Sequence, residues 1–388
     1  MAPPFRKPIL EQDLQGLKYF RLLLPLLERL HDNATERDHA GNRGLFFDQY
    51  CCLLLLFYFN PVIQSLRGLE QASKLEKVQK LFGCKRAALA SLSEASRIFD
   101  PDLLQQIIGE LASQARPLVS GNEALALCDL EAVDGSLLPA LPKMAWALWQ
   151  DTQHRAAKMH VHFDVLKGVP TRVTVTAGSA SERDQLRASL VPGGFYVIDR
   201  GYRGYDFFEE IVAADASFVA RVQENTVIHA AEERPLTAEA RTAGIVRDVV
   251  IKQTGSDRHK NFLQTPLRIL VVDTGKHLLN GAPDLMILCT NRLDLPAEMV
   301  ALAYKFRWAI ELFFRWFKRI LGCQHLLSNN LNGVTIQVYL GMIASLLISL
   351  WIGKKPTLRT LEMLQFYLMG WATEEELQAH IAHLKDQD

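Results

Sequence analysis

The order of secondary structure between residues 124 and 202 limits the fold of this chain more than any other feature of its sequence. Alternating apolar and polar residues predict strands there, and one segment with helical periodicity lies among them. In chain order these are strands at 124–136, 158–166 and 171–178, a helix at 181–190 and a strand at 194–202. This order predicts a mixed α/β domain.

Residues 1–120 differ from this region because they show no strand pattern. Apolar runs predict helices over 17–30, 46–59 and 99–115. We therefore expect an all-helical N-terminal domain over residues 1–120.

Residues 75–96 are typical of two short helices joined at Gly83. Such a helix-turn-helix shape would place Lys85 and Arg86 at the opening of the second helix, where they could contact DNA. Helix pairs joined at a glycine are common, so a purely structural pair is the alternative. On the first interpretation the N-terminal domain binds DNA.

The remaining chain divides into two further parts. Residues 121–350 are predicted to form the catalytic domain, with a second block of β-strands inserted at about 217–295. Residues 351–388 are predicted to form C-terminal helices. The apolar segment 336–353 approaches the length of a membrane span, but Gln337 and two serines within it favour a buried core helix.

Composition places few limits on the partners of the chain. The formal net charge of its 388 residues is zero, so any binding of DNA must depend on local basic patches. The six cysteines show no CxxC pair, which is typical of reduced thiols, and the N-terminus does not resemble a signal peptide. We expect a cytoplasmic, nucleoid-associated protein without a membrane partner.

Three carboxylates are candidate catalytic residues. Asp134 and Asp199 each lie at the end of a predicted strand, and Glu311 lies on a later helix. Two Mg²⁺ ions that catalyse phosphoryl transfer lie about 3.5 to 4 Å apart and must be held by hard oxygen ligands. We predict that these three acids are both the metal ligands and the catalytic residues, provided that the two aspartates lie on neighbouring strands. For either aspartate alone, a turn or a helix cap is the simpler explanation.

The predicted helix at 304–318 carries polar residues on one side only. On a helical wheel Tyr304, Arg307, Glu311 and Lys318 fall at about 0°, 300°, 340° and 320°. The opposite side carries Phe306, Ile310, Phe313 and Phe317, which would face a core. An ordinary amphipathic helix with an Arg307–Glu311 pair is the alternative to a catalytic surface.

These residues resemble the three motifs of bacterial insertion-sequence DDE transposases of the IS-four family. The motifs are VDGS at 133–136, VIDRGY at 197–202 and Tyr304-x2-Arg307-x3-Glu311-x6-Lys318. The resemblance covers residues from about 124 to 350, and the third motif matches at all four positions. It implies a ribonuclease-H-like catalytic domain with a β-strand insertion before the glutamate helix.

The resemblance also implies roles for individual residues. Asp134, Asp199 and Glu311 would hold Mg²⁺, for which Mn²⁺ would substitute. Contacts to DNA are expected from the basic helix surface, from an aromatic that packs against a displaced base, and from the N-terminal domain: Tyr304, Arg307, Trp308, Arg315, Lys318, Lys85 and Arg86. Relatives that form DNA hairpins supply a further aromatic from the insertion, and no tryptophan lies between residues 200 and 300 here.

The implied function is a transposase that binds the terminal inverted repeats of its own insertion sequence and catalyses metal-dependent DNA cleavage and strand transfer. Its partners would be double-stranded DNA, both transposon ends and target, and a second copy of the chain in a homodimer that holds two ends together. A non-mobile nuclease on the same fold and an inactive DNA-binding relic are the alternatives.

His160 and His162 share one face of a predicted strand and resemble half of a zinc site. No further ligand is spaced near them. We therefore expect either a polar lining near the site or a hydrogen-bonded core pair.

Overall fold

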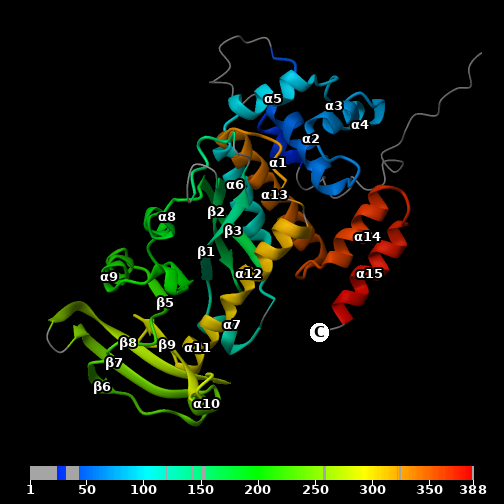
Figure 1. Cartoon of the computed structure of the whole chain (residues 1–388). Helices are drawn as coiled ribbons and strands as arrows, with labels where there is room; N and C mark the ends of the chain where they lie inside the picture. The colour runs from blue at the N-terminus through cyan, green and yellow to red at the C-terminus, as the bar shows by residue number, and fades with distance from the viewer. Residues whose placement is uncertain are drawn as a thin grey trace, which may run out of the picture. The chain divides into compact units, whose positions relative to one another are not determined.

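The computed structural model describes residues 24–31, 43–118, 120–140, 143–149, 154–256, 259–320, 322 and 325–386. These residues form two compact units (Figure 1). The first unit contains the described residues up to Ala115, residues 139–147 and residues from Arg315 onward, and the second contains 116–138 and 148–314. Residues 315–350, which the sequence analysis assigned to the catalytic domain, therefore cluster with the N-terminal helices.

The second unit is built on one nine-stranded sheet with the order β3-β2-β1-β4-β5-β9-β8-β7-β6. β4 pairs in parallel with both β1 and β5, whereas β5 and the strands beyond it pair antiparallel. The strands are β1 (Leu130–Pro139), β2 (Ala156–Asp164), β3 (Val169–Ala177), β4 (Phe195–Ile198), β5 (Ser217–Arg221), β6 (Ala230–Glu233), β7 (Ile245–Ser256), β8 (His259–His277) and β9 (Pro283–Thr290). The expected mixed α/β domain is confirmed.

The inserted strands extend this sheet instead of forming a separate one. β5 was expected to open the insertion at about residue 217, but its parallel pairing with β4 makes it part of the central sheet. The additional strands therefore begin at β6, and β9 joins them to β5 through pairs such as Ala220 with Cys289. The start of the added strands is therefore set by which strands pair, and local periodicity in the sequence does not reveal strand pairing.

Helices connect and cover the strands of this unit. They are α7 (Asn122–Ala126), α8 (Glu182–Ser189), the 3-10 helix η3 (Arg200–Tyr202), α9 (Tyr205–Ala213), α10 (Ala238–Thr242), α11 (Ala297–Phe306) and α12 (Trp308–Arg315). α9 packs on β5 and β8, and α11 packs on β4, β5 and β7. Phe218 and Ala220 of β5 belong to the α9 core, whereas Val219 between them is buried on the other side. Because successive strand residues alternate between faces, α9 and α11 cover opposite faces.

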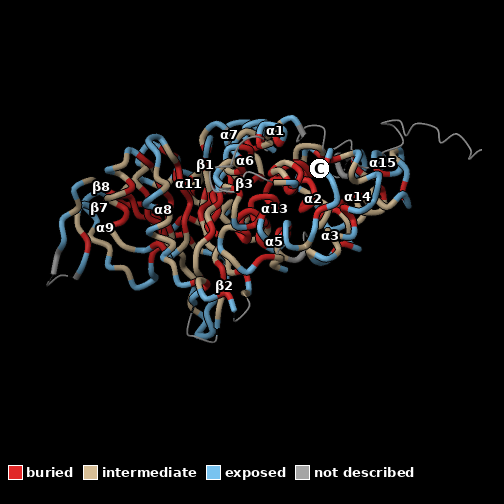
Figure 2. Tube along the Cα trace, turned by 90° about the horizontal axis from the view of Figure 1, so that it is seen from above, coloured by how far each residue is buried: buried red, intermediate tan, exposed pale blue. Residues whose placement is uncertain are grey.

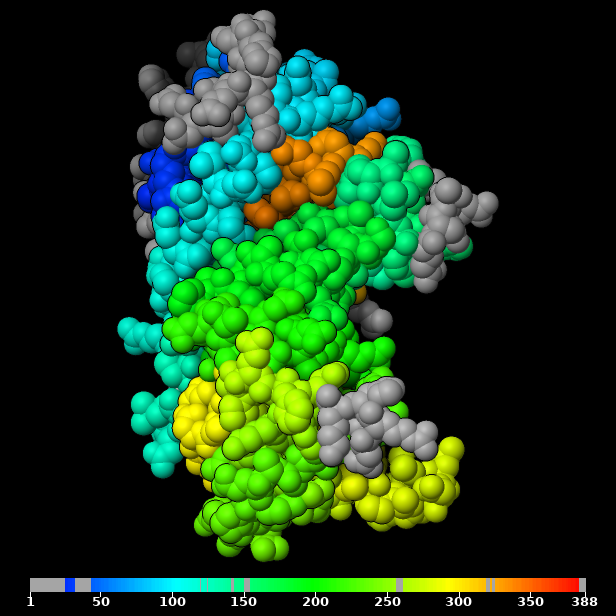
Figure 3. Space-filling view, turned by 90° about the vertical axis from the view of Figure 1, so that its left-hand side faces the viewer, coloured from blue at the N-terminus to red at the C-terminus, as the bar shows by residue number. Residues whose placement is uncertain are grey.

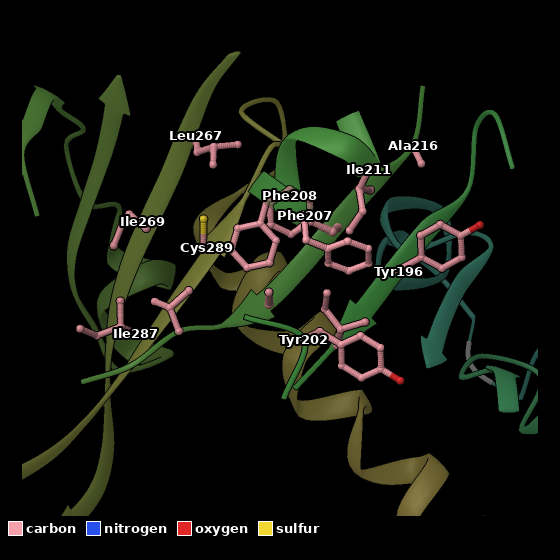
Figure 4. Close-up of a cluster of buried hydrophobic side chains, with 14 of the residues drawn as sticks. Tyr196, Tyr202, Phe207, Phe208, Ile211, Ala216, Leu267, Ile269, Ile287 and Cys289 are labelled. Atoms are coloured by element: carbon pink, nitrogen blue, oxygen red, sulfur yellow. The ribbon is translucent and has the colours of Figure 1, made fainter. Parts of the chain in front are cut away.

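A single hydrophobic cluster joins the central and the added strands. Phe207 and Phe208 of α9 belong to this cluster together with Ile269 of β8 and with Ile287 and Cys289 of β9. One of the two α9 rings lies beside Cys289, and the other lies farther from the added strands (Figure 4). All of these side chains are buried. Since burying one large apolar side chain is worth about 1.5–3 kcal/mol, this shared core makes the added strands part of the same unit.

The added strands also contain a buried ion pair. Arg268 of β8 donates two hydrogen bonds to Asp248 of β7, at 2.9 and 2.6 Å, and the side chains are only 2% and 3% exposed. Arg268 also donates to the carbonyl of Leu295, just before α11. The pair therefore ties the added strands to the segment that leads into α11.

The first unit is built mainly of helices in its described part. Its helices are α1 (Leu24–Glu28), α2 (Phe47–Phe59), α3 (Leu66–Ala72), α4 (Glu76–Phe82), α5 (Leu89–Ile98), α6 (Asp102–Gln114), the π-helix η4 (Trp316–Ile320), α13 (Leu331–Ile352), α14 (Leu358–Leu368) and α15 (Glu374–Asp386). α13 packs against α6, α2 and α5. The space-filling view shows the orange α13 beside the cyan helices (Figure 3).

Helix α13 is the core of this unit. Among the described residues it is the one helix long and apolar enough to cross a membrane, but 94% of its most apolar stretch is buried in the protein (Figure 2). Two of its buried polar side chains have hydrogen-bond partners, because Gln337 bonds to the backbone of His325 and Leu327 and Ser345 accepts from Trp316. The prediction of a buried core helix is confirmed.

Candidate active site

Strand pairing brings Asp134 and Asp199 together. In the parallel β1–β4 ladder, Leu130 pairs with Phe195 and Ala132 with Val197. The same register, continued by two residues, sets Asp134 opposite Asp199, which directly follows β4. Asp134 was expected to end its strand, but β1 continues to Pro139 and the aspartate lies within it. The condition for a shared metal site, two aspartates on neighbouring strands, is therefore met.

Both aspartates point to the face of the sheet that α11 covers. Their neighbours Val133 and Ile198 belong to the hydrophobic cluster under α9, on the opposite face. Alternation along each strand then directs Asp134 and Asp199 away from that cluster. The two carboxylates thus face the helices that carry the third motif.

Asp134 lies among more negative than positive charge. Burial, the Asp199 carboxylate and the Glu182 carboxylate raise the pKa of Asp134 from 3.8 to about 7. The Gly135 N–H, at 2.7 Å, and the Arg307 guanidinium oppose this rise only in part. A carboxylate in these surroundings is stabilised in its charged form by an added cation.

Asp199 also has a local structural role. Its carboxylate accepts a hydrogen bond of 2.7 Å from the Gly201 N–H and caps η3. This is the capping role weighed in the sequence analysis, and it holds the carboxylate at the end of β4 beside Asp134.

The third motif does not form the single regular helix expected over 304–318. α11 ends at Phe306, Arg307 caps it, and α12 begins at Trp308. Two i to i−3 hydrogen bonds, from Arg307 to Tyr304 and from Ile310 to Arg307, tighten the chain at this point, and η4 follows from Trp316. The expectation was wrong because a uniform 100° wheel ignores such tightened and widened turns.

Arg307 links Glu311 to the aspartates. Its guanidinium donates to Glu311 Oε1 at 2.6 Å and lies 3.9 Å from Asp134 Oδ2. It also lies over the Tyr304 ring, 5.7 Å from the centroid, and its side chain is only 13% exposed. The expected Arg307–Glu311 pair is therefore present, and it belongs to the cluster of acids instead of to an isolated helix surface.

The fit of these residues to a divalent cation is good for the aspartates and incomplete for Glu311. Asp134 and Asp199 supply the hard oxygen ligands that Mg²⁺ prefers, in a place with excess negative charge. Within the described ranges, no three His, Cys, Asp or Glu side chains already form a metal cluster. Glu311 is bound to Arg307 and has to leave it to become a ligand.

The other residues of the third motif differ in exposure. Trp308 is 51% exposed at the start of α12, and Tyr304 is half-buried beside Arg307. Arg315 is exposed and Lys318 is half-buried in η4; both belong to the first compact unit.

The prediction for Lys85 and Arg86 was wrong in one respect. α4 ends at Phe82 and α5 begins only at Leu89, so both basic residues lie in the connection and do not open the second helix. Gly83 adopts the left-handed conformation expected of a helix C-cap. Both side chains are exposed, and Arg86 lies 3.8 Å from Glu70.

The two histidines of β2 are hydrogen-bonded core residues, as one of the two expectations had it. His162 bonds to Glu131 and Ser189, both at 2.9 Å, and His160 bonds to Thr176 at 2.8 Å. Burial lowers the pKa of His160 to about 4, which keeps its ring neutral.

Sequence reasoning missed two charged residues near the acids. Glu182 of α8 is one of them, because its charge acts on Asp134. Arg221 ends β5 and interacts with Tyr304 and with Glu224, which it contacts at 2.7 Å. A local sequence signal for either residue is lacking, because both approach the acids only through the fold.

A polar hollow of about 640 Å³ opens beside Asp199. Arg200 and Arg203 line it from the η3 segment, and Gln223, Glu224 and Asn225 line it from the segment after β5. Glu224 lies 3.7 Å from Arg200 and offsets part of this positive charge. Guanidinium groups bind phosphates and amides bind base edges, so this lining suits a nucleic acid strand next to the acids.

Comparisons with known proteins agree with this geometry. Residues 130–347, more than half of the chain, match the family model described as "Transposase DDE domain". The y4zB protein of Sinorhizobium fredii, named as a transposase, is 30% identical over 61% of this chain and 63% of its own length. The chain thus spans less than two thirds of that relative.

Two further comparisons concern more of the chain. A Geobacillus stearothermophilus protein named as a transposase for insertion sequence element IS5377 is 23% identical over 74% of each chain. A cryo-EM structure of the piggyBac transposase synaptic complex with hairpin DNA aligns with a TM-score of 0.42 and 10% identity, over 95% of this chain and 85% of that one. A TM-score of this size does not establish a shared fold.

Proposed function

Because this chain belongs to the DDE transposase family, we propose that it binds the terminal inverted repeats of its own insertion sequence and catalyses metal-dependent DNA cleavage and strand transfer. The observation that carries this proposal is the meeting of Asp134 and Asp199 on adjacent parallel strands, with Glu311 tied to them through Arg307. The three acids are the catalytic residues in this proposal.

The subtype and the fold of the catalytic domain are part of the proposal. The Tyr304-x2-Arg307-x3-Glu311-x6-Lys318 spacing supports membership of the IS-four family. The β3-β2-β1-β4-β5 order, with β1, β4 and β5 parallel, supports a ribonuclease-H-like domain extended by β6 to β9. The N-terminal helices are proposed to form the DNA-binding domain, with Lys85 and Arg86 on its exposed surface.

Asp134 and Asp199 would hold Mg²⁺, or Mn²⁺ in its place, and Glu311 would complete the ligand set on release from Arg307. The bound ions would lower the pKa of water and stabilise the charge of the scissile phosphate. Arg307, once released, is placed beside the same acids to bind a phosphate of the DNA backbone. Tyr304, Arg315 and Lys318 are proposed to bind the backbone further along.

The partners are double-stranded DNA ends, target DNA and a second protomer, since two ends have to be held together during transposition. The protein is proposed to act in the cytoplasm, associated with the nucleoid.

A cleavage assay tests this function. Purified protein and Mg²⁺ are incubated with labelled duplexes made from the DNA that flanks its own gene, and nicks are mapped to single nucleotides; EDTA is the control. We expect nicks at one fixed position in an inverted repeat. Scattered metal-dependent nicks would instead identify a non-mobile nuclease, and binding without cleavage an inactive relic.

Trp308→Ala should weaken binding of end DNA about tenfold while leaving the melting temperature unchanged. The side chain is 51% exposed, so its removal costs little packing, whereas stacking of one base on an aromatic ring is worth about 1–3 kcal/mol. Trp371→Ala is the matched control, because Trp371 is 75% exposed in the other compact unit. Electrophoretic mobility shifts measure both affinities, and equal losses would contradict a specific role for Trp308.

A further inference from the structure

Glu182 reaches the backbone next to Asp134 because residue 135 has no side chain. A Cβ added at Gly135 would lie 2.5 Å from Glu182 Oε1 and 2.9 Å from Cδ. Glu182 stands in the first turn of α8, which Ser181 caps. Alternation along β1 turns Gly135 to the face opposite Asp134. Glu182 therefore approaches the aspartates from the face opposite to Glu311.

Lys158 of β2 holds Glu182 in this place. Its Nζ lies 3.4 Å from Glu182 Oε1 and donates to the Ala180 carbonyl at 3.0 Å, and its side chain is only 15% exposed. A low-exposure ion pair of this kind requires additional polar partners to offset desolvation, and the Ala180 carbonyl is one. The Lys158–Glu182 pair thus mirrors the Arg307–Glu311 pair on the other side of the aspartates.

The charges of this group leave room for a divalent cation. Four carboxylates, from Asp134, Asp199, Glu182 and Glu311, are accompanied by two cations, Lys158 and Arg307. When all are ionised the excess is two negative charges, which one Mg²⁺ or Mn²⁺ ion would neutralise.

The buried hydroxyl of Tyr202 is an independent indication that a polar site lies near these acids. Its side chain is 1% exposed, and its hydroxyl has no hydrogen-bond partner. The ring belongs to the hydrophobic cluster, but the hydroxyl points away from Phe207 (Figure 4). Tyr202 stands in η3, which Asp199 caps and which packs against α8, the helix that carries Glu182. Burial and the charges of Glu182, Asp134 and Asp199 raise the pKa of Tyr202 well above the ordinary value. A buried hydroxyl without a partner is rare in folded proteins.

We propose that Glu182 is a fourth carboxylate ligand of the divalent-cation site and that Lys158 takes the place of the cation beside Glu182 when no cation is bound. This proposal rests on the function proposed above, and it adds to the three acids of the family motifs a fourth acid supplied by α8. Binding of the cation then requires Lys158 to move away from Glu182.

The proposal is tested by cation binding to the full-length protein without DNA, so that the readout does not depend on cleavage. Isothermal titration with Mn²⁺ gives the affinity, and the rise in melting temperature on adding Mg²⁺ gives a second measure. Glu182→Gln should weaken binding about tenfold or more. Lys158→Met should strengthen it, because a competing positive charge is removed.

Asp184→Asn is the matched control. Asp184 stands in the same turn of α8, its side chain is 63% exposed and it pairs with Arg187 away from the acids. We expect its cation affinity to equal that of the unaltered protein. If the Lys158–Glu182 pair only stabilises the fold, Glu182→Gln and Lys158→Met should both lower the melting temperature in EDTA and leave cation affinity unchanged.

Failure of this inference is distinct from failure of the proposed function. Cation affinity that is lost in Asp134→Asn but unchanged in Glu182→Gln would overturn the role of Glu182 and leave the proposed function intact. An unaltered protein that binds neither Mn²⁺ nor Mg²⁺ would overturn both. Opposite effects of the Glu182 and Lys158 exchanges, with Asp184→Asn unchanged, are the expected result.

Discussion

Asp134→Asn should lower Mg²⁺-dependent DNA cleavage by about 10³-fold or more and at the same time raise the melting temperature of the metal-free protein at pH 8. The loss of cleavage follows from removing one of two adjacent carboxylate ligands. The amide group carries no net charge, so its oxygen is a much weaker ligand for Mg²⁺ than a carboxylate. The gain in stability follows from the surroundings of Asp134.

The sign of the stability change follows from its pKa. Burial, Asp199 and Glu182 raise the pKa of Asp134 in the folded protein to about 7, from the ordinary 3.8. Ionisation therefore destabilises the folded state as pH rises above about 4, and the cost is fully present above about 7. At pH 8 the neutral amide removes this cost. Below pH 4 the carboxyl is protonated in both states, so the difference disappears.

Differential scanning fluorimetry in EDTA at pH 8 and pH 5 measures this effect, and the mapped cleavage assay measures activity. Glu311→Ala is the companion variant, expected to keep end binding and to lose cleavage in the same assay. Cleavage that survives in either variant would show that the assigned acids are wrong. A melting temperature that falls in Asp134→Asn at pH 8 would contradict the electrostatic account of the site.

Asp248→Ala should lower the free energy of unfolding by about 3–5 kcal/mol. The change leaves the guanidinium of Arg268, whose side chain is 2% exposed, without its carboxylate partner. A buried unpaired charge is among the most costly defects in a protein interior. Because Arg268 also donates to the Leu295 carbonyl, the segment before α11 should lose order as well.

Urea unfolding of the full chain measures this loss, and two variants sharpen it. Glu233→Ala breaks the Arg247–Glu233 pair in the neighbouring strands, whose side chains are 41% and 59% exposed, and should change stability little. Replacing Asp248 by Leu and Arg268 by Met together should recover much of the stability, since no charge is then left buried. Unfolding of Asp248→Ala at the urea concentration of the unaltered protein would refute the role of the pair.

Much of the fold was readable because it depends on local patterns. The strand–strand–strand–helix–strand order predicted β1 to β4 and α8, since alternation and helical periodicity report which side of each element is buried. The first strand was expected from residue 124, but it begins only at Leu130, and Asn122–Ala126 forms α7. The apolar composition of α13, interrupted by Gln337 and serines, predicted a core helix for the same reason. Ile310, Phe313 and Phe317 are buried as the helical wheel required, whereas Phe306 is only half-buried.

Other features were not readable because they depend on partners distant in the chain. The position of β5 in the central sheet is set by its pairing with β4. The helix that carries Glu311 breaks at Arg307, where the guanidinium lies between Glu311 and Asp134. Lys85 and Arg86 were assigned to a helix that begins only at Leu89, because helix starts are set by capping and packing as well as by composition.

The sequence by itself determined the chemical identity and order of the three motif acids and the α/β class, because spacing and periodicity are properties of the chain alone. Only the tertiary structure decided which groups surround those acids. It brought Asp134 beside Asp199 through strand register, Glu182 to Asp134 across Gly135, and Lys158 to Glu182. The physical reason is that charges act through space, and residues tens of positions apart become neighbours only when strands pair and helices dock.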